Sequence, residues 1–244
     1  MSEVIERLRD DSEYYGAFGQ QYLSNSNISA LLNNPKMFGV RQPDNKAFAF
    51  GRLFHQLILE PEKASAFKFV DIKTRTSKAY KEAVEDSGED FLLLKKEVEW
   101  AEYLADTVVS NIELYDMIYA EGNEFERPGV TKIQGIPFKG KADIVTNTHI
   151  LDLKTTGDIS KFKWSAKNYN YDSQAYVYGL LFNRPMVFIV IDKTSRQMGV
   201  YRATDSFVES GKEKVERALK VYNKFFGEKA TESVDNYFIE QNLY

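Results

Sequence analysis

The hydrophobic period changes near residue 122, and this change constrains the fold of the 244-residue chain more than any other feature. Before it, apolar residues recur at the spacing of helices. After it, the period shortens towards the alternation of strands. The order of the two kinds of segment predicts a mixed α/β fold, in which helices pack on the faces of a central sheet. Because no repeat or long Pro/Gly/Ser-rich linker divides the chain, we expect a single domain over residues 1–244.

Residues 1–122 are expected to be mainly helical. Ser26 or Asn27 is a candidate cap for a short helix that Pro35 stops. Two longer stretches have helical spacing, namely Phe48–Leu59 and Leu94–Ser110. The polar stretch Thr74–Glu89 has no clear apolar face, so it is expected to form a mobile loop or a loosely docked helix.

Residues 123–227 are expected to form the α/β core, followed by a tail over residues 228–244. The predicted strands are Thr131–Ile136, Phe138–Val145, His149–Lys154, Met186–Asp192 and Gly199–Ala203, with turns at Gln134-Gly135 and Asn147-Thr148. One helix is predicted over Ser165–Phe182, and a last one between Asp205 and Gly227. The core is therefore predicted as a three-strand run, a helix, two strands and a helix.

Two predicted strands would bring acidic side chains together. If Asn147 and Thr148 form a two-residue loop, Asp143 lies opposite Asp152, with Cβ atoms about 4.5–5.5 Å apart. Lys154 projects from the same face as Asp152, because side chains alternate along a strand. A divalent cation such as Mg²⁺ would relieve the repulsion between the carboxylates. The alternative is a surface hairpin in which Lys154 only offsets neighbouring acids.

Composition excludes several classes of protein. The chain has no cysteine, which rules out disulfides, a thiol nucleophile and an iron–sulfur cluster. No apolar run reaches the length of a membrane span, and the first residues are too charged for a signal peptide, so a cytoplasmic protein is expected. A net charge of −4 argues against a protein that only coats nucleic acid. An enzyme with a local basic surface remains compatible with it.

The motif Asp143, eight residues, then Asp152-Leu153-Lys154 resembles the PD-(D/E)xK signature of nucleases, with Ala142 in place of the nominal proline. The longer strings resemble RecE-type exonucleases specifically. These strings are SNSNISALLNNP from Ser24, GRLFHQLILEPE from Gly51, ILDLKTTGDISKFK from Ile150 and YNYDSQ from Tyr169. The resemblance extends over about residues 24–178. It implies a restriction-endonuclease-like core, a mixed central sheet flanked by helices, with a helical N-terminal part.

The resemblance also implies roles for individual residues. In RecB- and RecE-like nucleases a helical histidine contacts the metal, and His55 matches its position, although a lone histidine in an apolar helix is more often a core residue. With Asp143 and Asp152, His55 and the Leu153 carbonyl would hold one or two Mg²⁺ or Mn²⁺ ions. Lys154 would align the attacking water.

Supporting residues are expected around this site. Gln174 and Tyr178 share a helix face and match a Gln-x-x-x-Tyr pair that lines the site in RecB-like families. An acid on the preceding strand often completes the site, and Glu124 and Glu126 are both candidates. The choice between these two acids stays open.

A basic segment surrounds the motif. Residues 132–167 contain seven lysines and three acidic residues, a net charge of +4 in a chain that carries −4 overall. Basic residues in this region are expected to contact phosphates, and Trp164 is expected to stack on an unpaired base. The residues predicted to contact DNA are Arg52, Lys161, Lys163 and Trp164. Each lysine could instead belong to a solvated loop.

The resemblance implies an exonuclease that digests one strand of linear duplex DNA in the 5′→3′ direction and leaves a 3′ single-stranded tail for recombination. It further implies a ring-shaped homotrimer or homotetramer, a single-strand annealing partner, and a bacterial or phage-infected host cytosol. Two alternatives remain. One is another nuclease, either a RecB-like single-strand exonuclease or a structure-specific endonuclease. The other is an inactive DNA-binding module that retains the fold.

Overall fold

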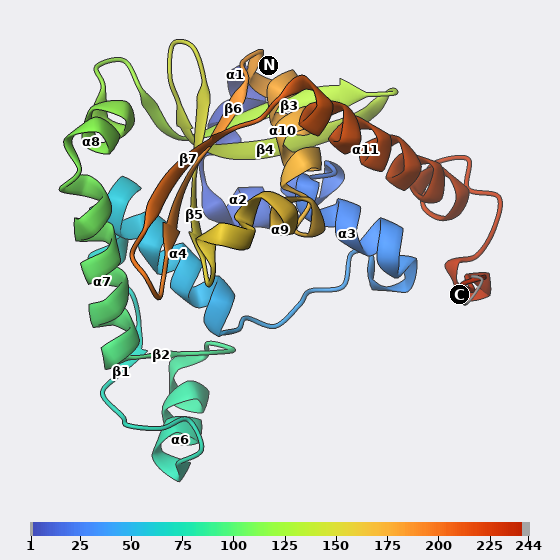
Figure 1. Ribbon diagram of the computed structural model, residues 1–244. Helices are drawn as coiled ribbons and strands as arrows, with labels where there is room; N and C mark the ends of the chain where they lie inside the picture. The colour runs from blue at the N-terminus through green and yellow to red at the C-terminus, as the bar shows by residue number, and fades with distance from the viewer. Residues whose placement is uncertain (1, 241–244) are drawn as a thin grey trace.

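The computed structural model describes residues 2–240, and a five-stranded mixed sheet lies at its centre (Figure 1). The strands are β3 (Glu124–Ile133), β4 (Ile136–Val145), β5 (Ile150–Thr156), β6 (Met186–Asp192) and β7 (Met198–Arg202), in that spatial order. All neighbours are antiparallel except β5 and β6, which are parallel. The predicted mixed α/β fold, with helices flanking the sheet, is confirmed.

Strand β3 differs most from its prediction. It begins at Glu124 rather than Thr131 and includes Pro128, which pairs with Lys141 of β4. Proline is tolerated here because β3 forms an edge of the sheet, where an N–H donor is not required on the solvent side. The strand ends at Ile133, and Gln134 and Gly135 form the predicted turn with φ of 51° and 83°. Two positive φ angles are typical of the tight turns that join antiparallel strands.

One face of the sheet is covered by three helices: α4 (Lys46–Leu59), α7 (Lys95–Val109) and α8 (Ile112–Tyr119). Their apolar residues bury Leu151 and Leu153 of β5. Helix α4 begins two residues before its predicted start. The Asn45 side chain accepts hydrogen bonds from the first free N–H groups, at 2.8 and 3.1 Å, and so caps the helix.

The opposite face carries α9 (Phe162–Asn168), α10 (Tyr171–Phe182) and α11 (Asp205–Phe225). The single helix predicted over Ser165–Phe182 is wrong, because Asn170 takes a left-handed conformation with φ of 59° and separates α9 from α10. Helix α11 lies within the predicted range between Asp205 and Gly227. It runs beside α10 (Figure 1). The N-cap of α11 is Thr204.

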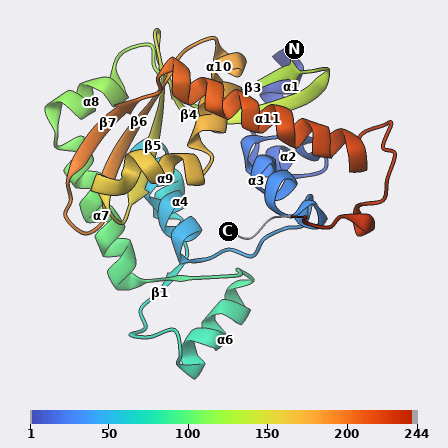
Figure 2. The ribbon, with the colours of Figure 1, turned by 45° about the vertical axis from the view of Figure 1, so that its right-hand side comes forward.

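A small lobe stands apart from the main sheet in both views (Figures 1 and 2). It contains the parallel strands β1 (Phe69–Val70) and β2 (Leu93–Leu94) and helix α6 (Lys78–Ser87). The polar stretch predicted as a loop or a loosely docked helix is thus a helix. Tyr80 docks it, since its ring is buried beside Leu92 and its hydroxyl donates to the Leu92 carbonyl at 2.9 Å.

The N-terminal part contributes α1 (Ser2–Arg7), α2 (Asp11–Tyr15) and α3 (Asn25–Asn33), of which only α3 was predicted. The predicted caps of α3, Ser26 and Asn27, are wrong by two and three residues: Ser24 precedes the helix, and its N–H donates to the Asn27 side chain at 2.8 Å. Leu23 pairs with Phe138 and so ties this part to β4. The remaining short helices are α5 (Pro61–Ser65) and the 3₁₀ turns Gly19–Gln21, Pro35–Met37, Ile159–Lys161 and Val234–Asn236.

Two further expectations concern the ends and the membrane. Of the tail predicted over residues 228–244, residues 241–244 lie outside the described part of the chain. Among the helices between residues 2 and 240, none has both the length and the apolar character needed to cross a membrane.

A close approach between α10 and α11 predicts the effect of a substitution. A Cβ on Gly211 of α11 would lie 2.0 Å from the Asp172 carbonyl oxygen of α10, so Gly211→Ala is expected to push the helices apart. We expect a loss of about 1–3 kcal/mol of unfolding free energy, which is roughly 2–4 °C of Tm per kcal/mol for a chain of this size. Thermal unfolding followed by circular dichroism measures it.

Gly51→Ala is the matched control. A Cβ at this helical position of α4 meets nothing within 4 Å, so alanine is expected to be neutral or stabilising by up to about 1 kcal/mol. Equal Tm values for Gly211→Ala and the wild type would show that the two helices can separate without cost.

Candidate active site

The paired strands separate at Asp143. Strands β4 and β5 pair through Ile144–Leu151 and Val145–Ile150, which is the register predicted from the two-residue loop. The next pair would be Asp143–Asp152, but the ladder stops before it. On its other side Asp143 also lacks a ladder partner, because the opposing Glu126 has φ of 47° and does not pair. Three acidic residues on adjacent strands therefore share one register position.

Side chains replace the missing ladder bonds. The Asp143 carboxylate accepts a hydrogen bond from the Leu153 N–H at 2.8 Å. The Leu153 carbonyl lies 2.6 Å from His55 Nε2, which must donate because a carbonyl oxygen only accepts. His55 Nδ1 lies 3.4 Å from Asp143 Oδ2. The structure thus brings His55, Asp143 and Leu153, three of the predicted ligands, into one hydrogen-bonded group.

Asp152 lies beside this group and is almost fully buried. Its Oδ1 accepts a hydrogen bond from Gln174 Nε2 of α10 at 2.6 Å. Its Oδ2 forms an ion pair with Lys154 but receives no hydrogen bond of acceptable geometry. Among the residues that the structure describes, this is the only buried carboxylate oxygen without a hydrogen bond.

Burial and charge shift the pKa values of this pair. Burial, together with the charge of Asp143, raises the pKa of Asp152 above its ordinary value despite the nearby ammonium group. Burial alone would lower the pKa of Lys154, but Asp152 and Asp143 outweigh it and raise that pKa. Lys154 is therefore a charged ammonium group, and its Nζ also lies 4.9 Å from the centre of the Tyr171 ring.

The structure distinguishes between the two candidate acids of β3. Glu124 is exposed and pairs with Arg127 at 2.7 Å, whereas Glu126 is half-buried and lies near Asp143. Burial, Asp143 and Glu60 raise the pKa of Glu126 to about 8. Glu126, and not Glu124, thus belongs to the cluster of acids.

Two neighbours of the site were not assigned by sequence reasoning. Glu60 approaches Glu126 from the end of α4, and Tyr171 covers Lys154 from the start of α10. Tyr178 was predicted, but its hydroxyl donates to the Lys141 carbonyl at 3.1 Å and so holds the backbone of β4 rather than a carboxylate. Glu60 and Tyr171 lie within the strings that resemble RecE-type nucleases. Their place in these strings was the signal that could have identified them as neighbours of the site.

The residues predicted to contact DNA are distributed over three elements: α4, the 3₁₀ turn Ile159–Lys161 and α9. Arg52 of α4 forms an ion pair with Asp44. Lys161 is exposed and pairs with Asp158 at 3.1 Å. Lys163 lies 4.3 Å from the centre of the Trp164 ring, and the Trp164 side chain is 62 % exposed. All four side chains are thus partly or fully accessible, but Arg52 and Lys161 are neutralised by neighbouring acids.

The donor set fits a divalent cation, although it is not already arranged as a complete metal site. Between residues 2 and 240 no three His, Asp or Glu side chains converge as ligands. The carboxylate of Asp152 is turned towards Lys154 and Gln174 instead. However, its buried, hydrogen-bond-free oxygen next to two further acids is the kind of group that a hard cation with oxygen ligands would satisfy.

Comparisons with known proteins agree with this fold. A crystal structure described as "Putative exonuclease" from Eubacterium rectale has a TM-score of 0.66 at 18 % identity, and the match covers 96 % of each chain. A phage-related exonuclease from Haemophilus somnus 129PT is 16 % identical over 64 % of this chain and 89 % of its own, but its TM-score of 0.32 is too low to support a shared fold. A comparison with curated proteins found no match.

A family model provides the clearest relation. It is described as a PDDEXK-like domain of unknown function (DUF3799), and it matches residues 29–233. The match includes both strands of the motif, His55, and helices α9 to α11. The chain therefore belongs to this PDDEXK-like family.

Proposed function

We propose that the protein is a divalent-metal-dependent DNA exonuclease. The observation that carries this proposal is the interruption of the β4–β5 ladder, which gathers His55, Asp143, Asp152 and Lys154 at one place. Nucleases with a PD-(D/E)xK core generally use divalent metals, and this chain has the acids and the lysine of that motif. An inactive DNA-binding module would have no need to keep two buried carboxylates beside a half-buried lysine.

Asp143, Asp152, His55 and the Leu153 carbonyl would hold one or two Mg²⁺ or Mn²⁺ ions. The bound metal would polarise the scissile phosphate and favour deprotonation of a water molecule. His55 Nε2 donates to the Leu153 carbonyl, so Nδ1, which faces Asp143, would be the nitrogen that holds the metal, and the second lone pair of the carbonyl oxygen would remain for it. Glu126 holds its proton up to a pH of about 8 without metal, and a bound cation would favour its ionisation and so add negative charge behind Asp143.

Lys154 would orient the attacking water and neutralise charge on the phosphate. Its ammonium group stays charged because Asp152 and Asp143 raise its pKa, so it acts as a hydrogen-bond donor and not as a base. Gln174 would fix the Asp152 carboxylate through Oδ1 and leave Oδ2 for the site. Tyr178 would maintain the position of β4.

The substrate is proposed to be linear duplex DNA, digested in the 5′→3′ direction to leave 3′ single-stranded tails. This choice rests on the resemblance to RecE-type nucleases, and the description of the Eubacterium rectale structure supports an exonuclease in general. On the same resemblance we propose that residues 1–244 act as one nuclease domain, assemble as a homotrimeric or homotetrameric ring, and work with a single-strand annealing protein in a bacterial or phage-infected cell.

Two substitutions test the roles of the acid and the lysine. Lys154→Ala is expected to reduce DNA cleavage by about 10²–10³-fold, because it removes a preorganised charge from the transition state, and to leave metal binding largely intact. Asp152→Ala is expected to abolish both cleavage and metal binding. Titration calorimetry with Mn²⁺, beside a cleavage assay, separates the two effects.

Lys220→Ala is the control, because Lys220 is an exposed lysine of α11 on a different part of the fold. It should behave as the wild type in both assays. Cleavage at the wild-type rate by Asp152→Ala or Lys154→Ala would refute the assigned site.

The mode of digestion is tested with two DNA substrates of the same sequence. An exonuclease of the proposed polarity should release labelled mononucleotides from the 5′ end of linear duplex DNA and leave closed circular DNA intact. Gel electrophoresis of both substrates measures this. Cutting of the closed circle would indicate a structure-specific endonuclease, and digestion of single strands alone would indicate a RecB-like exonuclease.

The raised pKa of Glu126 predicts a pH dependence of stability without metal. In the folded chain Glu126 binds its proton up to a pH of about 8, whereas the unfolded chain releases it near the ordinary value of 4.5. Between these values the folded state binds more protons, so this residue lowers stability as the pH rises. Glu126→Gln should therefore flatten the fall of Tm between about pH 5 and 8 in EDTA. Glu124→Gln is the matched control and should leave the slope unchanged.

A further inference from the structure

A basic pocket lies outside the cluster of acids. Its volume is about 520 Å³, and it lies between the start of α4, the start of α7 and the turn after β6. Its charged lining consists of Lys46, Lys96, Lys193 and Glu97, and Phe50 and Trp100 form its apolar walls. Three positive charges and one negative charge make it an electropositive hollow.

The one acid of this pocket is already neutralised. Glu97 pairs with Lys46 at 2.9 Å and with Arg75, and its pKa is lowered to about 2 because these partners and the Leu94 N–H outweigh the effect of burial. Over the described part of the chain, no carboxylate lies within 4.0 Å of the ammonium groups of Lys96 and Lys193. Two lysines thus remain available for an anion.

An aromatic pair forms one wall. The rings of Trp100 and Tyr103 are stacked, with centroids 5.3 Å apart and an interplanar angle of 16°. The Trp100 side chain remains 37 % exposed, and its Nε1 donates to the Lys193 carbonyl at 3.1 Å, which fixes the plane of the indole. Arg196 holds Tyr103 from the other side by donating to its hydroxyl at 2.6 Å. A fixed, partly open indole beside free lysines can stack on a nucleobase while the lysines contact phosphates.

The pocket lies near the candidate active site. Lys46 and His55 both belong to α4, nine residues apart, which is about 14 Å along the helix axis. On the sheet, Lys154 pairs with Val190, and Lys193 follows three residues later, which is about 10 Å. Single-strand-binding grooves hold about 4–16 nucleotides. A strand of this length spans both separations, although Lys46 and His55 project from opposite sides of α4, because nine residues rotate the helix by about 900°.

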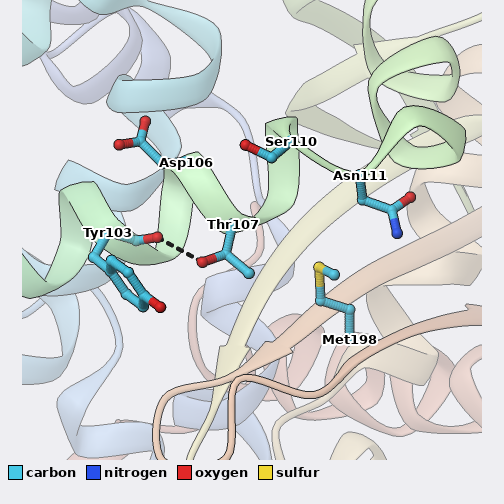
Figure 3. A pocket seen from close by; sticks show the side chains of 6 residues that line it. All are labelled: Tyr103, Asp106, Thr107, Ser110, Asn111 and Met198. Carbon is cyan, nitrogen blue, oxygen red and sulfur yellow. Dashed lines mark hydrogen bonds between the residues drawn. The ribbon is translucent and has the colours of Figure 1, made fainter.

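A second hollow of about 490 Å³, which Tyr103 helps to line, provides a contrast (Figure 3). Its lining contains Asp106 and the neutral side chains of Thr107, Ser110, Asn111 and Met198, without a lysine or arginine. Thr107 Oγ1 donates back to the Tyr103 carbonyl at 2.7 Å. This hollow offers a carboxylate to a ligand and does not suit a phosphate, so only the hollow on the Trp100 side has the chemistry of a nucleic-acid contact.

We propose that the pocket of Lys46, Lys96, Lys193 and Trp100 is a binding site for single-stranded DNA, used by an unpaired strand next to the cleaved end. The choice of DNA as the ligand of this pocket rests on the proposed nuclease function. The lysines contact phosphates, and Trp100 stacks on one base. Because stacking on the indole needs an unpaired base, the site distinguishes a single strand from a duplex.

Tryptophan fluorescence tests this site directly. The chain has two tryptophans, so Trp164→Phe leaves Trp100 as the only one. In EDTA, which prevents hydrolysis, an oligothymidine should quench Trp100 emission, whereas a blunt duplex closed by hairpins at both ends should not. Replacing both free lysines in Lys96→Gln/Lys193→Gln should lower the slope of log affinity against log salt by about 1.4. Trp100→Ala, followed by the anisotropy of a labelled oligothymidine, should weaken binding about 5- to 150-fold.

Lys220→Gln and Tyr115→Ala are the matched controls, an exposed lysine and an exposed aromatic residue on other surfaces. Circular dichroism verifies that each variant is folded. If Trp100→Ala and the double lysine variant bind oligothymidine as tightly as the wild type, the proposal is overturned. Loss in the lysine variant alone, with equal competition by inorganic phosphate, would show a simple anion site and also overturn it.

The experiments distinguish an error in the proposed binding site from an error in the proposed nuclease function. Binding is measured without cleavage, so it does not depend on the activity of Asp143, Asp152 and Lys154. Cleavage of bis(p-nitrophenyl) phosphate, which is too small to reach the pocket, should be the same in the pocket variants and the wild type. If none of these proteins cleaves linear DNA with Mg²⁺ or Mn²⁺ but oligothymidine still quenches Trp100, the proposed nuclease is wrong and the binding site stands.

Discussion

The arrangement of the candidate active site depends on one interruption of backbone pairing. Asp143 has no ladder partner on either strand beside it. Its carboxylate therefore bonds to the Leu153 N–H, and His55 bonds to the Leu153 carbonyl. A continuous ladder would have satisfied these backbone groups and left no need for polar side chains in the core. The interruption thus leaves backbone groups of Leu153 that the side chains of Asp143 and His55 satisfy.

A second constraint brings Gln174 to Asp152 from the other face of the sheet. Helix α10 can approach β4 closely because Gly140 has no side chain, and a Cβ there would lie 2.9 Å from the Tyr178 ring. The fully buried Asp172 then pairs with Lys214 of α11 at 2.9 Å, which fixes the start of the helix. Both contacts join residues distant in sequence. The position of Gln174 is therefore set by the packing of three elements and not by its own helix.

Local patterns predicted the sheet well and the helix boundaries less well. Strand-like apolar patterns identified all five strands, although β6 is buried along its whole length and no residue of β7 is fully buried. These patterns missed the start of β3, where Pro128 and Gly129 interrupt the pattern, since an edge strand tolerates residues that a central strand excludes. Apolar periodicity also could not show the break at Asn170, because a single left-handed residue changes the direction of the chain without changing the spacing of apolar residues.

By itself, the sequence determined the mixed α/β fold, the register of the β4–β5 hairpin and the acids and lysine that converge there, because period-two alternation and a two-residue loop leave one possible pairing. Only the tertiary structure decided that Glu126 and not Glu124 joins Asp143, and that Tyr171 covers Lys154. It also assembled the pocket of Lys46, Lys96, Lys193 and Trp100. These residues come from elements far apart in the chain, and no local spacing records a contact that depends on how the helices pack on the sheet.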